Sequence, residues 1–336
     1  MKRFLSVTFV LGAIACGPKQ KGPELAPLPP DKVEEPPPKT DDKPVVEEPP
    51  ARPVPVGPLD IKIEPRTTKV KLVKAGTGKR MPLKVSPKEG ATQQVELALD
   101  FSVTQALAGS TDPNDTQVDL VPTVVLAGKG EAKTAAADGA EFQITVEKTD
   151  AIEHKDAKVP MDKFREVLAS TVGLTIAGKV APNGASGEIA LHQDKQGEAS
   201  AQVLDLVRLT FPAWPALPAE PVGTGGKWQA TTSYKLADRL DVTQVTDFEV
   251  VSIKNGVWTI KGTTKVTGAD QMMQGGKITK IAGTGTIELT FTDGQLFPSY
   301  KSRVETTFSA SEATPTTPNP PRIDFKIVVG GTMTAK

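Results

Sequence analysis

Apolar and polar residues alternate with a period of two through most of the chain from about residue 61 onward. The run QQVELALDFSV, for example, places Val95, Leu97, Leu99, Phe101 and Val103 on one face. Similar runs carry further apolar positions at Phe142, Ile144, Val172, Ile176, Trp228, Tyr234, Ile260, Leu289, Phe308 and Ile327. Successive side chains of a strand point to opposite faces, so the pattern predicts antiparallel strands with one face on a core and one toward water.

Four dipeptides mark tight turns between these runs: Asp138-Gly139, Asn183-Gly184, Asn255-Gly256 and Asp293-Gly294. Asn-Gly and Asp-Gly suit the type I′ hairpin, which needs a positive φ at both central residues. Two of the four fall in residues 67–210 and two in residues 222–336. This spacing predicts two pseudo-repeated, curled sheet halves, each opened by a glycine before a long strand.

Two stretches change to helical spacing. PMDKFREVLASTV has Met161, Phe164 and Leu168 on one stripe, and GEASAQVLDLVRLTF has Val203 and Leu206 on another. A helix lying on a membrane surface needs a basic polar face, which neither segment has. We therefore predict an all-β, mainly antiparallel domain over residues 61–336, with one or two short helices covering the core or an open sheet edge.

The beginning of the chain has the pattern of an export signal. Lys2 and Arg3 precede an uncharged stretch, Phe4–Ala15, of about 12 residues. That length is too short for a helix that must span roughly 30 Å of hydrocarbon. Residues 1–15 are therefore interpreted as a signal peptide.

Small residues lead up to Cys16, which is the chain's only cysteine. The sequence Ala13-Ile14-Ala15-Cys16-Gly17 resembles the lipobox of bacterial lipoproteins, although that family most often has Leu at the position of Ala13. The resemblance implies cleavage before Cys16 and acylation of its thiol and new amine, which anchors a protein stably to a membrane. The alternative is ordinary signal cleavage with no role for Cys16. Gly17, where enteric inner-membrane lipoproteins have Asp, favours the outer membrane by analogy.

Residues 16–60 form a segment of different composition, with 14 of the 30 prolines interspersed with Lys, Glu and Asp. Proline removes backbone donors, and such a segment buries too little apolar surface to offset its ordering entropy. We expect a disordered tether with partly stiff polyproline II character that spaces the domain from the membrane. The alternative interpretation is a docking ligand for a proline-recognition or peptidoglycan-associated partner.

Two glycine-containing segments resemble motifs of an uncharacterised family of bacterial lipoproteins. The stretch Leu217–Trp228 reads LPAEPVGTGGKW and resembles an LP..PVG.G..W motif between two β-rich halves. The stretch Lys71–Gly78 reads KLVKAGTG and resembles the start of the same domain. The resemblance would cover most of residues 67–310. It implies an exported, two-part β domain of unknown function and brings no catalytic residues.

The search for chemistry gives few candidates. Lys+Arg and Asp+Glu both number 40, so no basic excess attracts nucleic acid. His154 lies in a polar loop and His192 ends an alternating run, and neither has the spacing of a metal site. The acidic loop from Asp112 to Asp119 lacks the glycine and terminal glutamate of a calcium loop. We predict no catalytic residue, cofactor or metal.

Two further glycine motifs do not match the sites that they resemble. Ala75–Arg80 lacks the first glycine and the terminal Ser or Thr of a phosphate loop. Gly184-Ala185-Ser186-Gly187 lacks the spacing of a nucleophile elbow.

Together these patterns predict a membrane-anchored envelope lipoprotein whose β domain is not an enzyme. Its partners would be the membrane, through the lipid on Cys16, and a lipid, glycan or envelope protein held by the domain. A curled sheet with helices over its open side could enclose an apolar groove, as in lipoprotein carriers, by analogy of fold only. The alternatives are an envelope hydrolase, whose carboxylate pair a sequence cannot locate, and a purely structural component of an envelope complex.

Overall fold

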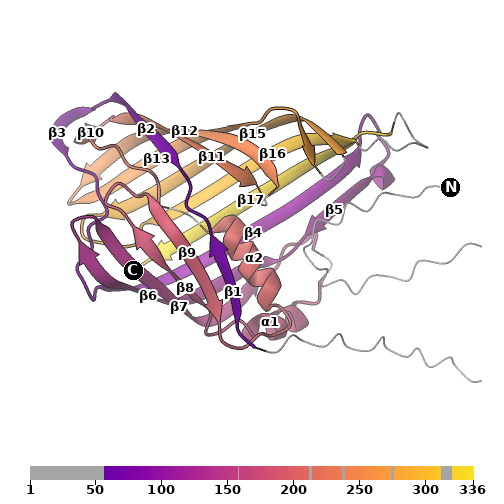
Figure 1. Ribbon diagram of the computed structural model, residues 1–336, viewed down its shortest axis with the longest axis horizontal. Coiled ribbons are helices and arrows are strands. Elements are labelled where there is room, and N and C mark those ends of the chain that lie inside the picture. Colours follow the sequence, from indigo (N-terminus) through magenta and orange to yellow (C-terminus); the bar gives the residue numbers. More distant parts are fainter. Residues whose placement is uncertain (1–56, 158, 212–213, 237–238, 274–275, 312–319) are drawn as a thin grey trace, which may run out of the picture. The chain divides into compact units, whose positions relative to one another are not determined.

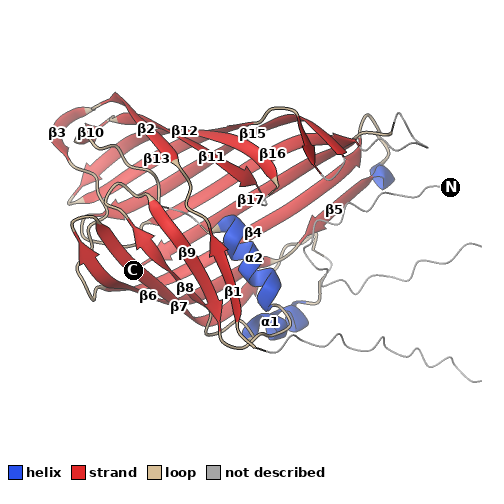
Figure 2. Ribbon diagram, in the orientation of Figure 1, coloured by secondary structure: helices blue, strands red, loops and turns tan. Residues whose placement is uncertain are grey.

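The computed structural model describes residues 57–336 apart from 158, 212–213, 237–238, 274–275 and 312–319. Cys16, the signal peptide and nearly all of the tether lie outside the described residues. Contacts group residues 55–336 into one compact unit, and its described part is mainly antiparallel β-structure with two short α-helices, as predicted (Figures 1 and 2).

Strands of the first part of the chain are β1 (Leu59–Ile63), β2 (Thr68–Lys74), β3 (Thr77–Met81), β4 (Thr92–Leu107), β5 (Thr116–Leu120), β6 (Thr123–Ala136), β7 (Gly139–Ile152), β8 (Thr175–Val180) and β9 (Ser186–Gln193). Those of the second part are β10 (Val222–Thr224), β11 (Lys227–Leu236), β12 (Leu240–Lys254), β13 (Val257–Thr267), β14 (Gln271–Met273), β15 (Gly276–Thr292), β16 (Ser299–Ser311) and β17 (Ile323–Ala335). The helices are α1 (Met161–Ala169) and α2 (Ser200–Thr210), with a 3-10 turn at Pro113–Asp115.

Fifteen of these strands join one sheet in the order β1-β9-β8-β7-β6-β4-β17-β16-β15-β13-β12-β11-β2. β5 adds to β4 and β14 to β15, while β3 and β10 pair separately. Most neighbours are consecutive hairpins, but the last strand, β17, pairs along its whole length with β4 (Ala335 opposite Val95, Ile323 opposite Leu107). The β4–β17 pairing therefore joins the early and late parts of the chain into one sheet.

The sheet is curled, as the contacts of one helix show: strands that are far apart in the sheet order contact the same helix. Helix α2 packs against β1, at one end of the order, and also against β4 and β17 near its middle. The two edge strands, β1 and β2, are in turn separated by only residues 64–67, and Figure 1 shows them as one continuous run across the front of the sheet. One segment of chain thus forms both edges.

The interior of the curl is filled by the chain that links the two parts. Helix α2 is buried on most of its surface, and the crossover after it places Trp214 and Leu217 in the core. The ring of Trp214 lies 4.8 Å from that of Phe142 and 5.5 Å from that of Phe297. The indole N–H of Trp214 donates to the Leu296 carbonyl oxygen at 2.8 Å, so a buried polar group is satisfied.

The two glycine segments that resemble the lipoprotein-family motifs pack against each other. β3 and β10 form the small second sheet, and the Gly223 N–H donates to the Ala75 carbonyl oxygen at 2.8 Å. Gly76 has φ +82°, and a Cβ there would lie 2.5 Å from the Gly223 oxygen and 2.6 Å from the Gly226 nitrogen. The residues of the rejected phosphate loop therefore form a close backbone contact.

The prediction of type I′ turns is confirmed at one of four positions. Asn255 and Gly256 both have positive φ, 52° and 78°, and they alone separate β12 from β13. At the other three turns only the glycine has positive φ (Gly139, Gly184 and Gly294), so the predicted type is wrong there. The connections that contain Gly184 and Gly294 are longer than two residues, and such connections need a left-handed conformation at one residue only, which glycine supplies. Gly139 lies just after its two-residue connection and pairs with Ala136.

Both predicted helices are present, as α1 and α2, and α1 packs on β7. One predicted strand position is wrong: Val172 lies in the turn after α1 and is 46% exposed, and the strand begins only at Thr175. Helix α1 and the turn that follows it thus include a residue that the alternation assigned to a strand. No helix of the described residues combines the length and apolar character needed to cross a membrane.

The contact between the glycine segments gives a first prediction. Gly76→Ala should lower the urea midpoint of unfolding, because it adds overpacking of about 1–3 kcal/mol to the cost of a left-handed alanine, about 1–2 kcal/mol. Gly78→Ala is the matched control, because Gly78 also has positive φ but a Cβ there meets nothing within 4 Å. Equal midpoints for the two variants would show that the close approach is not important.

Gln93 gives a second prediction. Its Oε1 accepts hydrogen bonds from the N–H groups of Leu296 and Phe297, both at 2.9 Å. Both residues are buried, so Gln93→Ala should cost about 1–3 kcal/mol for each donor left unsatisfied. The adjacent Gln94→Ala, at an exposed side chain on the opposite face of β4, should change the urea midpoint little. A Gln93→Ala protein as stable as the Gln94→Ala protein would contradict this role.

Candidate functional site

The candidate residues from the sequence do not converge in the structure. His154 lies in an exposed loop, with its Nδ1 3.9 Å from the Asp156 carboxylate. In the acidic loop, Asp112 Oδ1 accepts hydrogen bonds from the Asn114 N–H and side-chain amide, and Asp115 accepts one from Ser110. These carboxylates stabilise a turn. Across the described residues, no group of three or more His, Cys, Asp or Glu side chains is arranged to hold a metal ion.

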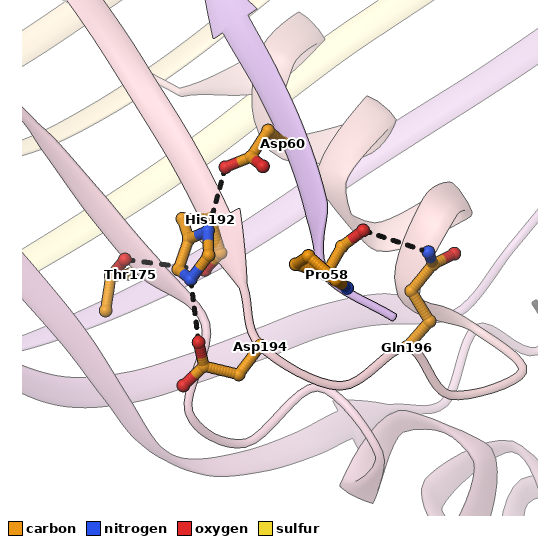
Figure 3. Close-up of polar contacts among 6 residues, drawn as sticks. All are labelled: Pro58, Asp60, Thr175, His192, Asp194 and Gln196. Atoms are coloured by element: carbon orange, nitrogen blue, oxygen red, sulfur yellow. Dashed lines mark hydrogen bonds and ion pairs between the residues drawn. The ribbon is translucent and has the colours of Figure 1, made fainter. Parts of the chain in front are cut away.

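His192 is the histidine with specific partners. It lies near the end of β9, beside the edge strand β1 (Figure 3). Its Nδ1 lies 2.8 Å from Asp60 Oδ1 and its Nε2 lies 2.8 Å from Asp194 Oδ1. Each ring nitrogen therefore faces a carboxylate, an arrangement that favours the imidazolium form, in which both nitrogens donate.

These hydrogen bonds, first to Asp60 and then to Asp194, raise the pKa of His192 above its usual value of 6.5. The arrangement does not match a hydrolytic triad, in which one ring nitrogen faces a nucleophilic hydroxyl. The nearby Thr175 hydroxyl donates to the backbone carbonyl of His192, at 3.4 Å, and not to the ring. Because the two carboxylates lie at opposite nitrogens, they also cannot share one metal ion with the ring.

The His192 cluster marks the place where the chain enters the folded unit. Besides the Asp60 contact, the Gln196 side-chain amide donates to the Pro58 carbonyl oxygen at 3.2 Å (Figure 3). The Gln196 N–H donates to the Gly57 carbonyl oxygen at 3.3 Å. The loop after β9 therefore fastens the first described residues onto the sheet edge.

Sequence reasoning missed this cluster. Asp60 and His192 are 132 positions apart, and only the β1–β9 register, with Asp60 opposite His192, brings them together. The alternation in LHQ and LDIKI shows that both residues are on polar faces. It gives no information on which strands pair.

The cavity beside the crossover in the apolar interior is small. A cavity of about 10 Å³ is lined by residues of the core, including Leu83, Trp214, Leu217 and Phe291. That is about the volume one water molecule needs. A second, open groove of about 370 Å³ lies where β11 and β12 meet, and it is lined mainly by polar side chains.

Carboxylates of the described residues are all at least partly exposed, and the buried polar side chains are Thr171, Gln193, Ser200, Thr210, Thr246, Thr264, Thr306 and Ser309. A general acid with a pKa raised by an apolar pocket, as glycosidases use, requires a buried carboxyl group. The described residues do not provide one.

Comparison with known proteins assigns no family. No protein-family description matches the chain, and no curated protein matches it either. One solved structure, the outer membrane protein OprG from Pseudomonas aeruginosa, aligns with 74% of this chain and 98% of its own. The aligned residues are 8% identical and the TM-score is 0.19, so this likeness carries no argument about fold or function.

The raised pKa of His192 predicts a pH dependence of stability. A histidine whose pKa is higher folded than unfolded stabilises the fold below its unfolded pKa, and this contribution disappears as pH rises through the folded pKa. The urea midpoint of the wild-type protein should therefore fall above about pH 6.5 more than that of His192→Asn. NMR titration should give His192 a pKa above 6.5, which Asp60→Asn lowers. A His192 pKa at or below 6.5 would contradict the two ion pairs.

Proposed function

We propose that this protein is a lipid-anchored component of the bacterial cell envelope whose β domain binds a partner and does not catalyse a reaction. The proposal for the anchor is supported by Cys16, the chain's only cysteine, placed directly after a signal-type apolar stretch. Acyl chains on Cys16 would hold the protein on the membrane. The proline-rich stretch that precedes the compact unit would then space the domain from the lipid surface.

The volume of the interior cavity bears on whether the β domain holds a lipid inside or binds a partner at its surface. A lipid carrier must provide an apolar space for acyl chains, and drug-sized ligands already need roughly 300–1,000 Å³. The cavity lined by Trp214, Leu217 and their neighbours has about 10 Å³. This single observation favours a partner bound at the surface or at an open end over a lipid held inside the curl.

The location is proposed as the outer membrane, because Gly17 replaces the aspartate that retains enteric lipoproteins in the inner membrane. An envelope hydrolase is the less favoured alternative. Within the described part of the chain, the His192 cluster is the one acid–base arrangement that supports it, and both of its ring nitrogens are already paired with carboxylates.

The anchor is tested by Cys16→Ala in cells. We expect this variant to leave the membrane fraction, because the acyl chains that supply about 0.8 kcal/mol per buried CH₂ are lost. The released protein should have the same urea midpoint as the wild type, because Cys16 lies outside the compact unit of residues 55–336. Ala13→Leu, which restores the more common lipobox residue, is the matched control and should stay membrane-bound.

Cys16→Ala protein that remains in the membrane fraction after a high-salt wash would contradict the lipid anchor. A soluble Cys16→Ala protein that has lost its fold would contradict the independence of the domain from the anchor.

A further inference from the structure

Arg66 lies on the interior side of the segment that joins the two edge strands. It comes two residues before Thr68, which begins β2, and Val70 and Leu72 continue the same alternation. Val70 and Leu72 pair with Ala230 and Trp228, which are core residues. Val70 and Leu72 therefore face the inside of the curled sheet. Arg66 lies before β2, and its contact with Tyr234, on the same face of β11 as Trp228 and Ala230, places it on that side.

The guanidinium of Arg66 stacks on an aromatic ring. Its Cζ lies 4.5 Å from the centroid of the Tyr234 ring, which is in the range of a cation–π contact. A cation–π contact does not use the N–H donors of the guanidinium in a hydrogen bond. Among the described residues, no carboxylate lies within ion-pair distance of this cation.

The groups near Arg66 provide hydrogen bonds without negative charge. The Thr68 and Thr232 hydroxyls lie 2.8 Å apart, and the Tyr234 hydroxyl donates to Gln244 Oε1 at 3.1 Å. Gln244 in turn donates to the Thr246 hydroxyl at 3.3 Å. A row of hydroxyl and amide groups thus extends from Arg66 across β11 and β12.

Arg66 is exposed to solvent, yet burial lowers its pKa, with the Tyr234 contact opposing that effect. The side chain is thus in contact with solvent and also close to enough protein to be partly desolvated. This is the environment of a side chain in an open recess. A partly desolvated cation without a counter-charge is unfavourable, and an anion from solution would relieve it.

Tyr234 also lines the open groove of about 370 Å³, together with Ser233, Asp241, Val242, Thr243, Gly268 and Ala269. Lys235 at its border is already paired with Asp241 at 2.9 Å. The groove has the volume of a small-molecule site. Tyr234 is therefore shared between the Arg66 contact and a groove whose own cation, Lys235, is occupied by Asp241.

We propose that Arg66, held on the ring of Tyr234, binds a carboxylate or phosphate group of a ligand that occupies this groove. The planar fork of a guanidinium matches the paired oxygens of either group. The inference rests on the proposed function, because it locates the site at which the β domain would bind its partner.

The test is calorimetric titration of the full chain, purified in a non-ionic detergent, with inorganic phosphate, glycerol 3-phosphate and acetate. We expect saturable binding of at least one of these anions. Preference for glycerol 3-phosphate would indicate a lipid headgroup, preference for inorganic phosphate a free anion, and preference for acetate a carboxylate ligand.

Arg66→Gln should weaken this binding about tenfold or more, because it removes the charge-assisted hydrogen bonds. Arg66→Lys, which keeps the charge without the planar fork, should bind with intermediate affinity and covers the case in which the glutamine variant fails to fold. Arg303→Gln is the matched control, because Arg303 is exposed on the outer face of β16.

Absence of saturable binding for all three anions would overturn the proposal. Equal weakening by Arg66→Gln and Arg303→Gln would also overturn it, because it would reduce the effect to net charge. Neither result affects the lipid anchor, which is tested separately by fractionation of the Cys16→Ala protein.

Discussion

A curled sheet of fifteen strands must cover its concave apolar face, and this protein does so with its own chain. Helix α2 and the crossover with Trp214 and Leu217 lie between strands that are far apart in the sheet order. The crossover could not enter an apolar interior unless its polar groups were satisfied. The indole and backbone hydrogen bonds of Trp214, Leu217 and Trp228 provide this.

Filling the interior has a consequence for the edges of the sheet. Free edges invite pairing with other chains, and natural proteins protect them with lysines and short strands. Here β1 and β2 are both short and belong to one segment, with Lys62 paired to Glu188 and with Lys69 and Lys71 on β2. The His192 cluster and Gln196 fasten the start of this segment. Arg66 lies in residues 64–67, which connect the two edge strands.

Local pattern predicted both helices and most of the long strands, because each depends on the spacing of nearby apolar residues. It placed Val172 wrongly in a strand, and Leu59 and Asp60 of β1 fell within the predicted tether. It was not enough to predict pairing between distant strands, such as β4 with β17 or β1 with β9. The contacts of Asp60 with His192 and of Arg66 with Tyr234 depend on that pairing, so no local signal indicated them. The glycines of Lys71–Gly78 and Leu217–Trp228 were noticed as motifs, but their mutual contact appears only in the fold.

Hydrogen exchange of the tryptophan indoles measures how stably the crossover fills the interior. The chain has three tryptophans, so their indole N–H resonances can be assigned by single substitutions. The Trp214 and Trp228 indoles donate to backbone carbonyls inside the curl. Both should exchange only through global unfolding, as slowly as the most protected amides of the central strands. Exchange within minutes under native conditions would show that the crossover opens readily, and would contradict the account of a filled core.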